Sequence, residues 1–232
     1  MKKFPIFSRK LLFPLCTALL VSSPVWAGEL ENHIDKASVY VKARDYRRAI
    51  REYEEVIKIN PDHARTNLLL GLVYADIGDL DQAVKYTEKA LELDPSYNAY
   101  NNLALVYANR ADFDKAIDNY EKAMAINPSA FTPYYHMGLI YSAKKDYEKA
   151  LTFYKKAVEL NSQYADAYVG LGSALYYTGD KAGAWGQVEK LKNLKFKPQS
   201  EGLADWLKSK ENRQDPPTTA PSSTPSERNA QG

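Results

Sequence analysis

Residues 97–130 carry two short segments in which apolar or small residues recur at helical spacing, separated by a polar turn. These residues are Tyr100, Leu103, Ala104 and Tyr107 in the first segment, and Ala116, Tyr120, Ala123 and Met124 in the second. Asp112 lies at the start of the second segment, where aspartate is a good N-cap. The Asn127-Pro128 step ends it, because a residue before proline avoids the helical region. The pattern predicts a helical hairpin, which cannot bury its apolar face alone.

The hairpin pattern is repeated along the chain with a period of 34 residues and one step of 33. The predicted units are residues 30–63, 64–96, 97–130, 131–164 and 165–198. We number repeat positions from the first residue of each unit. Matches at five or six positions across five units predict an all-α array of stacked hairpins.

Each repeated position has a physical reason. Small residues stand at positions 8 and 20, where they let paired helices approach closely. These are Ala37, Gly71, Ala104, Gly138 and Gly172 at position 8, and Ala49, Ala83, Ala116, Ala150 and Ala184 at position 20. Position 11 is tyrosine in four units and can fill the space beside them, and position 16 is always aspartate, a cap for the second helix.

This pattern resembles the tetratricopeptide repeat family over residues 30–198. The resemblance implies a right-handed superhelical α-solenoid of five helix-turn-helix repeats. The last unit lacks a proline like Pro128 at the end of its second helix. That helix also contains Gly183 and Gly186, which weaken it. Atypical end units are expected, because the terminal faces of a stacked array meet water.

The residues after the array predict a cap and a tail. Residues 199–210 are expected to form a capping helix, with Ser200 as N-cap and Leu203, Trp206 and Leu207 on the buried face; the alternative is a helix that binds a partner. Residues 211–232 are rich in Pro, Ser and Thr and lack large apolar residues, so we expect a disordered tail.

The first 27 residues have the layout of a secretory signal peptide, with a basic start, an apolar run and small residues before a cut between Ala27 and Gly28. We therefore expect an exported protein, periplasmic or extracellular; the alternative is a chain anchored in the membrane by an uncleaved segment. Removing the segment also removes four of the 31 basic residues, which leaves 27 against 29 acidic ones. This balance does not favour nucleic acid as a partner.

The sequence offers no constellation for catalysis. His33, His63 and His136 lie in different units without metal-ligand spacing, so we expect no metal and no cofactor. Gly170 and Gly172 lie within a helical pattern rather than in a phosphate-binding loop. We expect a protein that is not an enzyme.

Binding is the remaining class of function. In the tetratricopeptide family the first helices line a concave groove, and the resemblance carries groove positions onto this chain. The predicted groove residues are Leu68, Leu72, Asn98, Asn101, Asn102, Leu105, Asn109, Tyr135, His136, Leu139 and Tyr176, joined by Ala75, Val169 and Tyr177. For the leucines the alternative is packing between neighbouring helices, and for the asparagines and His136 it is a solvated surface.

Amides beside tyrosines and leucines suit an extended or helical peptide, so we expect a protein or peptide ligand bound by a non-catalytic scaffold. Some members of the family bind the terminal carboxylate of a peptide with lysine and asparagine side chains at set positions. We do not expect this clamp here, because Asn102 matches its asparagine but Ile34, Leu68 and Asn101 stand where it needs lysine. Exported bacterial members of the family often serve envelope assemblies. The alternatives are a glycan-binding or polysaccharide-export module that uses the groove tyrosines, and self-association through the end units.

Overall fold

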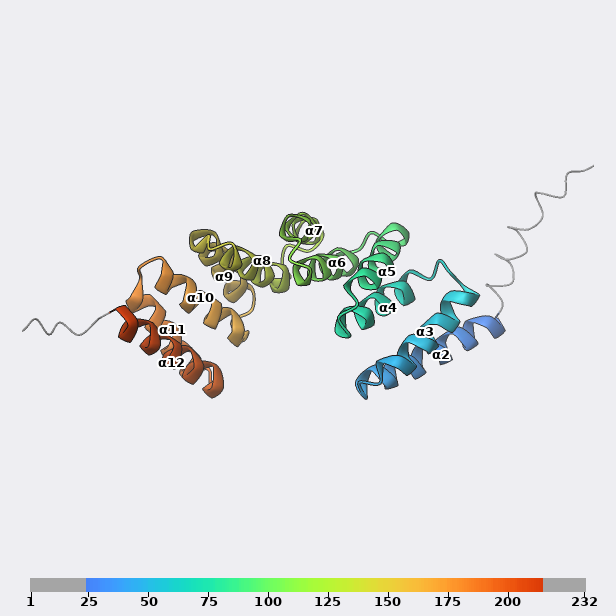
Figure 1. The fold of residues 1–232 in the computed structure, drawn as a ribbon, viewed down its shortest axis with the longest axis horizontal. Coiled ribbons are helices and arrows are strands. Elements are labelled where there is room, and N and C mark those ends of the chain that lie inside the picture. The colour runs from blue at the N-terminus through green and yellow to red at the C-terminus, as the bar shows by residue number, and fades with distance from the viewer. Residues whose placement is uncertain (1–23, 215–232) are drawn as a thin grey trace, which may run out of the picture. The chain divides into compact units, whose positions relative to one another are not determined.

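The computed structural model describes residues 24–214, with side chains from 27 to 212. These residues form eleven helices and no strand (Figure 1). The helices are α2 (Pro24–Lys42), α3 (Tyr46–Ile59), α4 (Ala64–Asp76), α5 (Leu80–Leu93), α6 (Tyr97–Asn109), α7 (Phe113–Ile126), α8 (Phe131–Ala143), α9 (Tyr147–Leu160), α10 (Ala165–Tyr177), α11 (Lys181–Asn193) and α12 (Lys197–Gln214). The all-α prediction is confirmed, and units two to five begin at the first residues of α4, α6, α8 and α10.

The chain divides into two compact units, residues 1–140 and 141–232, with the boundary inside α8. The described part of the first unit holds the hairpins α2–α3, α4–α5 and α6–α7. The second holds α9 to α12. Among the described residues, no helix combines the length and the apolar character that crossing a membrane requires.

Small residues bring the paired helices together, as the repeat predicts. Every alanine at position 20, from Ala49 to Ala184, is completely buried. At position 8, a Cβ added to Gly71 would collide with the side chain of Thr87 and lie 3.1 Å from its backbone nitrogen. Close approach of α4 and α5 therefore depends on glycine at this position.

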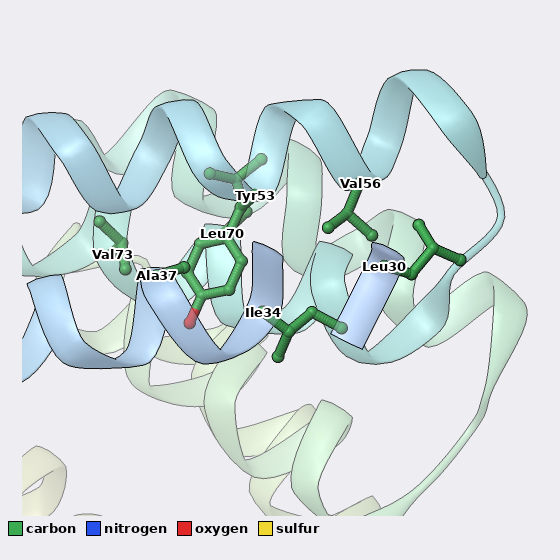
Figure 2. Packing of buried hydrophobic residues seen from close by; sticks show 7 residues of the cluster. All are labelled: Leu30, Ile34, Ala37, Tyr53, Val56, Leu70 and Val73. Atoms are coloured by element: carbon green, nitrogen blue, oxygen red, sulfur yellow. The ribbon is translucent and has the colours of Figure 1, made fainter. Parts of the chain in front are cut away.

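The first hairpin buries its apolar stripe against the second (Figure 2). Leu30, Ile34 and Ala37 of α2 point toward α3, while Leu70 and Val73 of α4 close the cluster. All of them are at least nine-tenths buried. The outer side of α2 keeps Lys36 and Val39 exposed, which suits the first element of an array.

The aspartates at position 16 begin the second helices, with one correction. Four of them accept a hydrogen bond from the backbone N–H three residues later: Asp45, Asp79, Asp146 and Asp180. Asp112 is also the N-cap residue, but its side chain makes no such bond. Its carboxylate lies 3.5 Å from Arg110 Nε instead.

The capping helix begins earlier and ends later than predicted. Ser200 is not the N-cap, because α12 starts at Lys197 and the buried Ser200 donates to the Lys197 carbonyl at 2.9 Å. Pro198 lies in the first turn of this helix, where proline is tolerated because the backbone N–H that it lacks would have no partner within the helix.

At the far end of α12, the indole Nε1 of Trp185 donates to Glu211 Oε1 at 3.0 Å. Residues 211–214 of the expected tail are therefore helical, and the rest of the tail lies outside the described residues. The signal segment up to residue 23 also lies outside them, and the Ala27–Gly28 bond falls within α2.

The capping function of α12 follows from its buried face. Leu203 and Leu207 are 2% and 0% exposed, and a Cβ added to Gly172 would lie 2.7 Å from Leu203 Cδ2. Gly172 therefore also makes room for the cap, in addition to the pairing of α10 with α11.

Replacing Ala116 by leucine should overpack the crossing of α6 and α7 and lower the free energy of unfolding by ~1–3 kcal/mol. The fully buried alanine leaves no space for three further carbon atoms. Urea unfolding followed by circular dichroism measures the change. Stability equal to wild type would refute the repeat register.

Replacing Ala111 by glycine should raise stability by up to ~1 kcal/mol, because Ala111 has φ +62° in the turn before α7, where a Cβ is strained. Its N–H bond to the Ala108 carbonyl, at 3.0 Å, needs no side chain. The equivalent residues Gly78 and Gly179 show that the turn accepts glycine. A lower thermal midpoint for the variant would contradict this explanation.

Candidate functional site

In the first compact unit, residues 1–140, the predicted groove residues lie on α4, α6 and α8, the first helices of repeats two to four. At 100° per residue, Asn98, Asn102, Leu105 and Asn109 share one face of α6, and Leu103 and Tyr107 lie on the other side. Leu103 and Tyr107 are buried, whereas Asn98 and Asn109 are exposed. Leu68, Leu72 and Leu105 are half-buried, and Leu139 is 42% exposed.

A hollow of about 160 Å³ opens between the starts of α4 and α6 and the end of α5. Two predicted groove residues, Leu68 and Asn98, line it. Arg65 and Asp94 bring opposite charges to its rim, residues that sequence reasoning did not select. The repeat pattern could have identified Arg65, because it stands at position 2, the same position as the predicted groove residue Asn98 in the next unit.

Asn101 and Asn102 form a pair of neighbouring amides on α6. Asn101 Nδ2 donates to Asn102 Oδ1 at 3.4 Å, a long bond. The Asn101 Oδ1 atom is buried and has no hydrogen-bond partner in the described part of the chain. The Asn102 Nδ2 atom also makes no hydrogen bond to residues 24–214. Turning both amides over exchanges donor and acceptor, but the pair still keeps one amide nitrogen and one amide oxygen that make no hydrogen bond.

An aromatic and polar layer between α7 and α8 lies next along the chain. The ring of His136 stacks on the fully buried ring of Tyr120, with centroids 5.6 Å apart, and the ring of Tyr135 meets His136 edge-on at 5.2 Å. The Tyr120 hydroxyl is buried without a partner among the described residues. Burial raises the pKa of Tyr120 and lowers the pKa of His136, so both side chains are neutral near pH 7.

Tyr176 is a correction to the predicted groove. It is only 5% exposed, because the ring of Trp206 packs against it with centroids 5.4 Å apart. Tyr177, the next residue, is 43% exposed but stacks on Tyr147 at 4.2 Å. The cap α12 therefore covers the end of the second unit that the repeat register assigned to the groove.

Clusters of histidine, cysteine and carboxylate side chains that could hold a metal ion do not occur in residues 24–214. His33 lies 2.7 Å from Glu52 Oε2. His63 caps α4, with its Nδ1 atom accepting from the Thr66 N–H at 3.2 Å.

Family models described as "Tetratricopeptide repeat" match residues 34–98 and 135–192, and residues 95–163. The first of these models alone covers more than half of the chain. The chain belongs to the tetratricopeptide repeat family.

Among curated proteins, the chain is similar to heat shock protein STI1 of Saccharomyces cerevisiae, with 31% identity over 83 residues, which are 34% of this chain and 14% of that protein. It is also 34% identical over 67 residues to Hsp70-Hsp90 organizing protein 3 of Arabidopsis thaliana, which covers 29% of this chain and 12% of that protein. The chain therefore spans only a small part of these relatives.

Among solved structures, a crystal structure of MamA is 28% identical with a TM-score of 0.64, covering 74% of this chain and 94% of that one. MamA of Desulfovibrio magneticus RS-1 is 21% identical with a TM-score of 0.66, covering 73% and 96%. YrrB, described as a tetratricopeptide repeat protein with an unusual peptide-binding site, is 16% identical with a TM-score of 0.61, covering 82% and 97%. These last two likenesses concern the fold.

Acid should destabilise the protein through His63 and His136, because burial lowers the pKa of each below its ordinary value of 6.5. The unfolded chain binds these protons near pH 6.5, and the folded chain binds them only at lower pH. Their contribution is therefore constant above pH 6.5 and is lost as the pH falls from 6.5 through the folded pKa values. Urea unfolding across this pH range measures it.

A double variant keeps the contacts of the two histidine side chains but removes their titratable groups. His63→Asn retains a capping side chain, and His136→Phe retains a ring against Tyr120. Its unfolding free energy should fall less than that of wild type between pH 7 and pH 5. Equal pH dependence in the two proteins would exclude these histidines as the cause.

Proposed function

We propose that the chain is a non-catalytic scaffold that binds an extended peptide segment of a partner protein along the first-helix face of α4, α6 and α8. The observation that carries this proposal is the Asn101–Asn102 amide pair, with its buried oxygen that lacks a hydrogen bond. A buried polar atom without a partner costs about 1–3 kcal/mol, and a ligand that supplies the missing bond recovers this energy.

An extended peptide carries the groups that this pair needs. Each peptide unit has one N–H and one C=O, and the pair offers one acceptor and one donor on adjacent residues. A helical ligand uses its backbone groups internally, so it cannot satisfy the pair except at its ends. Asn101 as a residue is half-buried, although its Oδ1 atom is buried.

Apolar side chains of the other first helices support the same ligand. Leu68 of α4 lines the hollow of about 160 Å³, and Leu139 of α8 is exposed. Alternate side chains of an extended peptide point to the same surface, so apolar residues two apart could use such contacts. Membership of the repeat family, whose known relatives include proteins named as organisers of chaperones, supports protein binding in general.

Work outside the cytoplasm is part of the proposal and rests on the layout of the first 27 residues. A scaffold in the cell envelope is the role that the family resemblance and this layout support together.

A glycan-binding function is not proposed, because the tyrosine rings are used in packing. Tyr168 and Tyr176 are 5% exposed. The hydroxyl groups of Tyr97, Tyr134 and Tyr168 are bonded to Thr132, Pro128 and Ser162. Sugar stacking needs exposed ring faces in a row, and burial removes Tyr168 and Tyr176 from such a row.

The test uses a peptide selected against the full-length protein from a displayed library, with affinity measured by calorimetry. Asn101→Ala and Asn102→Ala should each weaken it roughly ten-fold, as the loss of one or two hydrogen bonds implies. Adding Tyr135→Ala to Asn102→Ala should weaken it further and leave the helical content unchanged. Asn193→Ala, at an exposed position at the end of α11, is the matched control and should bind as wild type does.

The peptide itself provides a second test of the mechanism. N-methylation of one backbone amide removes a donor and preserves every side chain, so one methylated position should abolish binding. If every singly methylated peptide binds like the parent, or if the two asparagine variants bind normally, the proposed recognition is wrong.

A further inference from the structure

The larger hollow of the first unit lies on the side of α6 opposite the amide pair. It has a volume of about 540 Å³, and its lining residues come from the helices α5, α6 and α7. Its lining residues are Glu88, Leu91 and Glu92 from α5, Leu103 and Tyr107 from α6, and Lys115, Asp118, Asn119 and Lys122 from α7. A volume of this size holds several side chains.

The hollow occurs where the repeat departs from its neighbours. At repeat position 23, Tyr86 stacks on Tyr74 in the second repeat at 5.5 Å, and Phe153 stacks on Tyr141 in the fourth at 5.4 Å. The third repeat has Asn119 there, and its amide donates to the Lys115 carbonyl at 2.8 Å. The smaller side chain is held against its own helix, so the volume of an aromatic ring is not filled.

The two walls of the hollow differ in charge, and its floor is apolar. Glu88 and Glu92 stand on α5, and Lys115 and Lys122 stand on α7. Between them lie Leu91 and the buried Leu103.

Some of these charges are already used. Glu88 accepts from the Tyr107 hydroxyl at 2.6 Å; burial, together with this bond, raises the pKa of Tyr107 to about 12. Lys122 pairs with Asp118 at 2.7 Å. Glu92 and Lys115 form no ion pair within residues 24–214, although the Lys115 Nζ atom lies 5.0 Å from the centroid of the Tyr107 ring. Each wall therefore keeps one charged group without an oppositely charged partner.

We propose that this hollow is a second docking site, which takes an amphipathic helix of a partner protein. The helix places an apolar side chain on Leu91 and Leu103, with a basic residue toward Glu92 and an acidic residue toward Lys115. A helix fits because residues three and four apart project along one face, with charged residues on its two edges. Nucleic acids and other polyanions do not fit, because the α5 wall repels them.

This site is independent of the proposed peptide groove. The residues Leu103 and Tyr107 face it from α6, and Asn102 and Leu105 face away from it. One chain could therefore hold two protein segments at once, an extended peptide on one side of α6 and a helix on the other, which goes beyond the groove binding proposed above.

The test titrates the full-length protein with synthetic helical peptides built on an alanine-rich host. The main probe carries a leucine stripe with lysines on one edge and glutamates on the other. Three control peptides replace the leucines by alanine, make both edges lysine, or make both edges glutamate. Calorimetry measures affinity, and nitrogen-15 NMR follows the side-chain amide signals of Asn119, Asn101 and Asn102.

The mixed-edge peptide should bind at least about ten-fold more tightly than each control peptide and shift the Asn119 signal, with those of Asn101 and Asn102 unchanged. Equal binding of all four peptides, no binding of any, or shifts at Asn101 and Asn102 instead would overturn the proposal.

Two variants test the site from the protein side. Asn119→Phe places at position 23 the aromatic ring that neighbouring units already carry, so the fold should persist while the hollow fills and affinity falls about ten-fold. Glu121→Phe puts the same ring at an exposed position of α7 outside the lining and should leave affinity unchanged.

Glu92→Lys should shift the preference from the mixed-edge peptide to the peptide with two glutamate edges. A purely structural effect would not produce this change of specificity. Wild-type affinity in Asn119→Phe, or an unaltered preference in Glu92→Lys, would refute the second site.

Discussion

The close approach of two helices at small residues is the contact on which the rest of this structure depends. The alanines at position 20 are completely buried, and in the second repeat a Cβ on Gly71 at position 8 would lie 3.2 Å from the carbonyl oxygen of Ala83 at position 20. Short side chains here lose no rotamer freedom and let larger residues at the edges of the crossing bury their surface. Because the second helix covers one side of each first helix, the opposite side remains available to ligands.

Both proposed binding sites involve the third repeat, at positions where its residues differ from those of the other repeats. The third repeat combines two features that the others lack, adjacent asparagines at positions 5 and 6 and an asparagine at position 23. The first leaves an unpaired amide oxygen, and the second leaves an unfilled hollow. The helical repeat does not require either feature, since no other unit has asparagine at positions 5, 6 or 23.

The starts of the second helices follow directly after the position 16 aspartates, because N-cap residues act locally on the backbone. The first helices of units two to five start at the first residues of the predicted units. Differences from prediction occur at helix starts, where a residue can adopt either of two local arrangements. The capping helix was expected from residue 199 with Ser200 as N-cap, but it starts at Lys197, since Pro198 is compatible with the first turn of a helix. Asp112 was expected to cap α7 with its side chain, but Arg110 competes for the carboxylate.

The sequence by itself determined the helical hairpins, their register and the family, because these follow from periodic patterns within 34 residues. The tertiary structure alone decided which candidate site residues are accessible. Tyr176 is buried because Trp206, 30 residues later in the chain, packs on it, and Asn119 leaves a hollow because α5 supplies nothing to fill it. Exposure and unpaired hydrogen-bonding atoms depend on side chains from distant segments, which a repeat pattern does not specify.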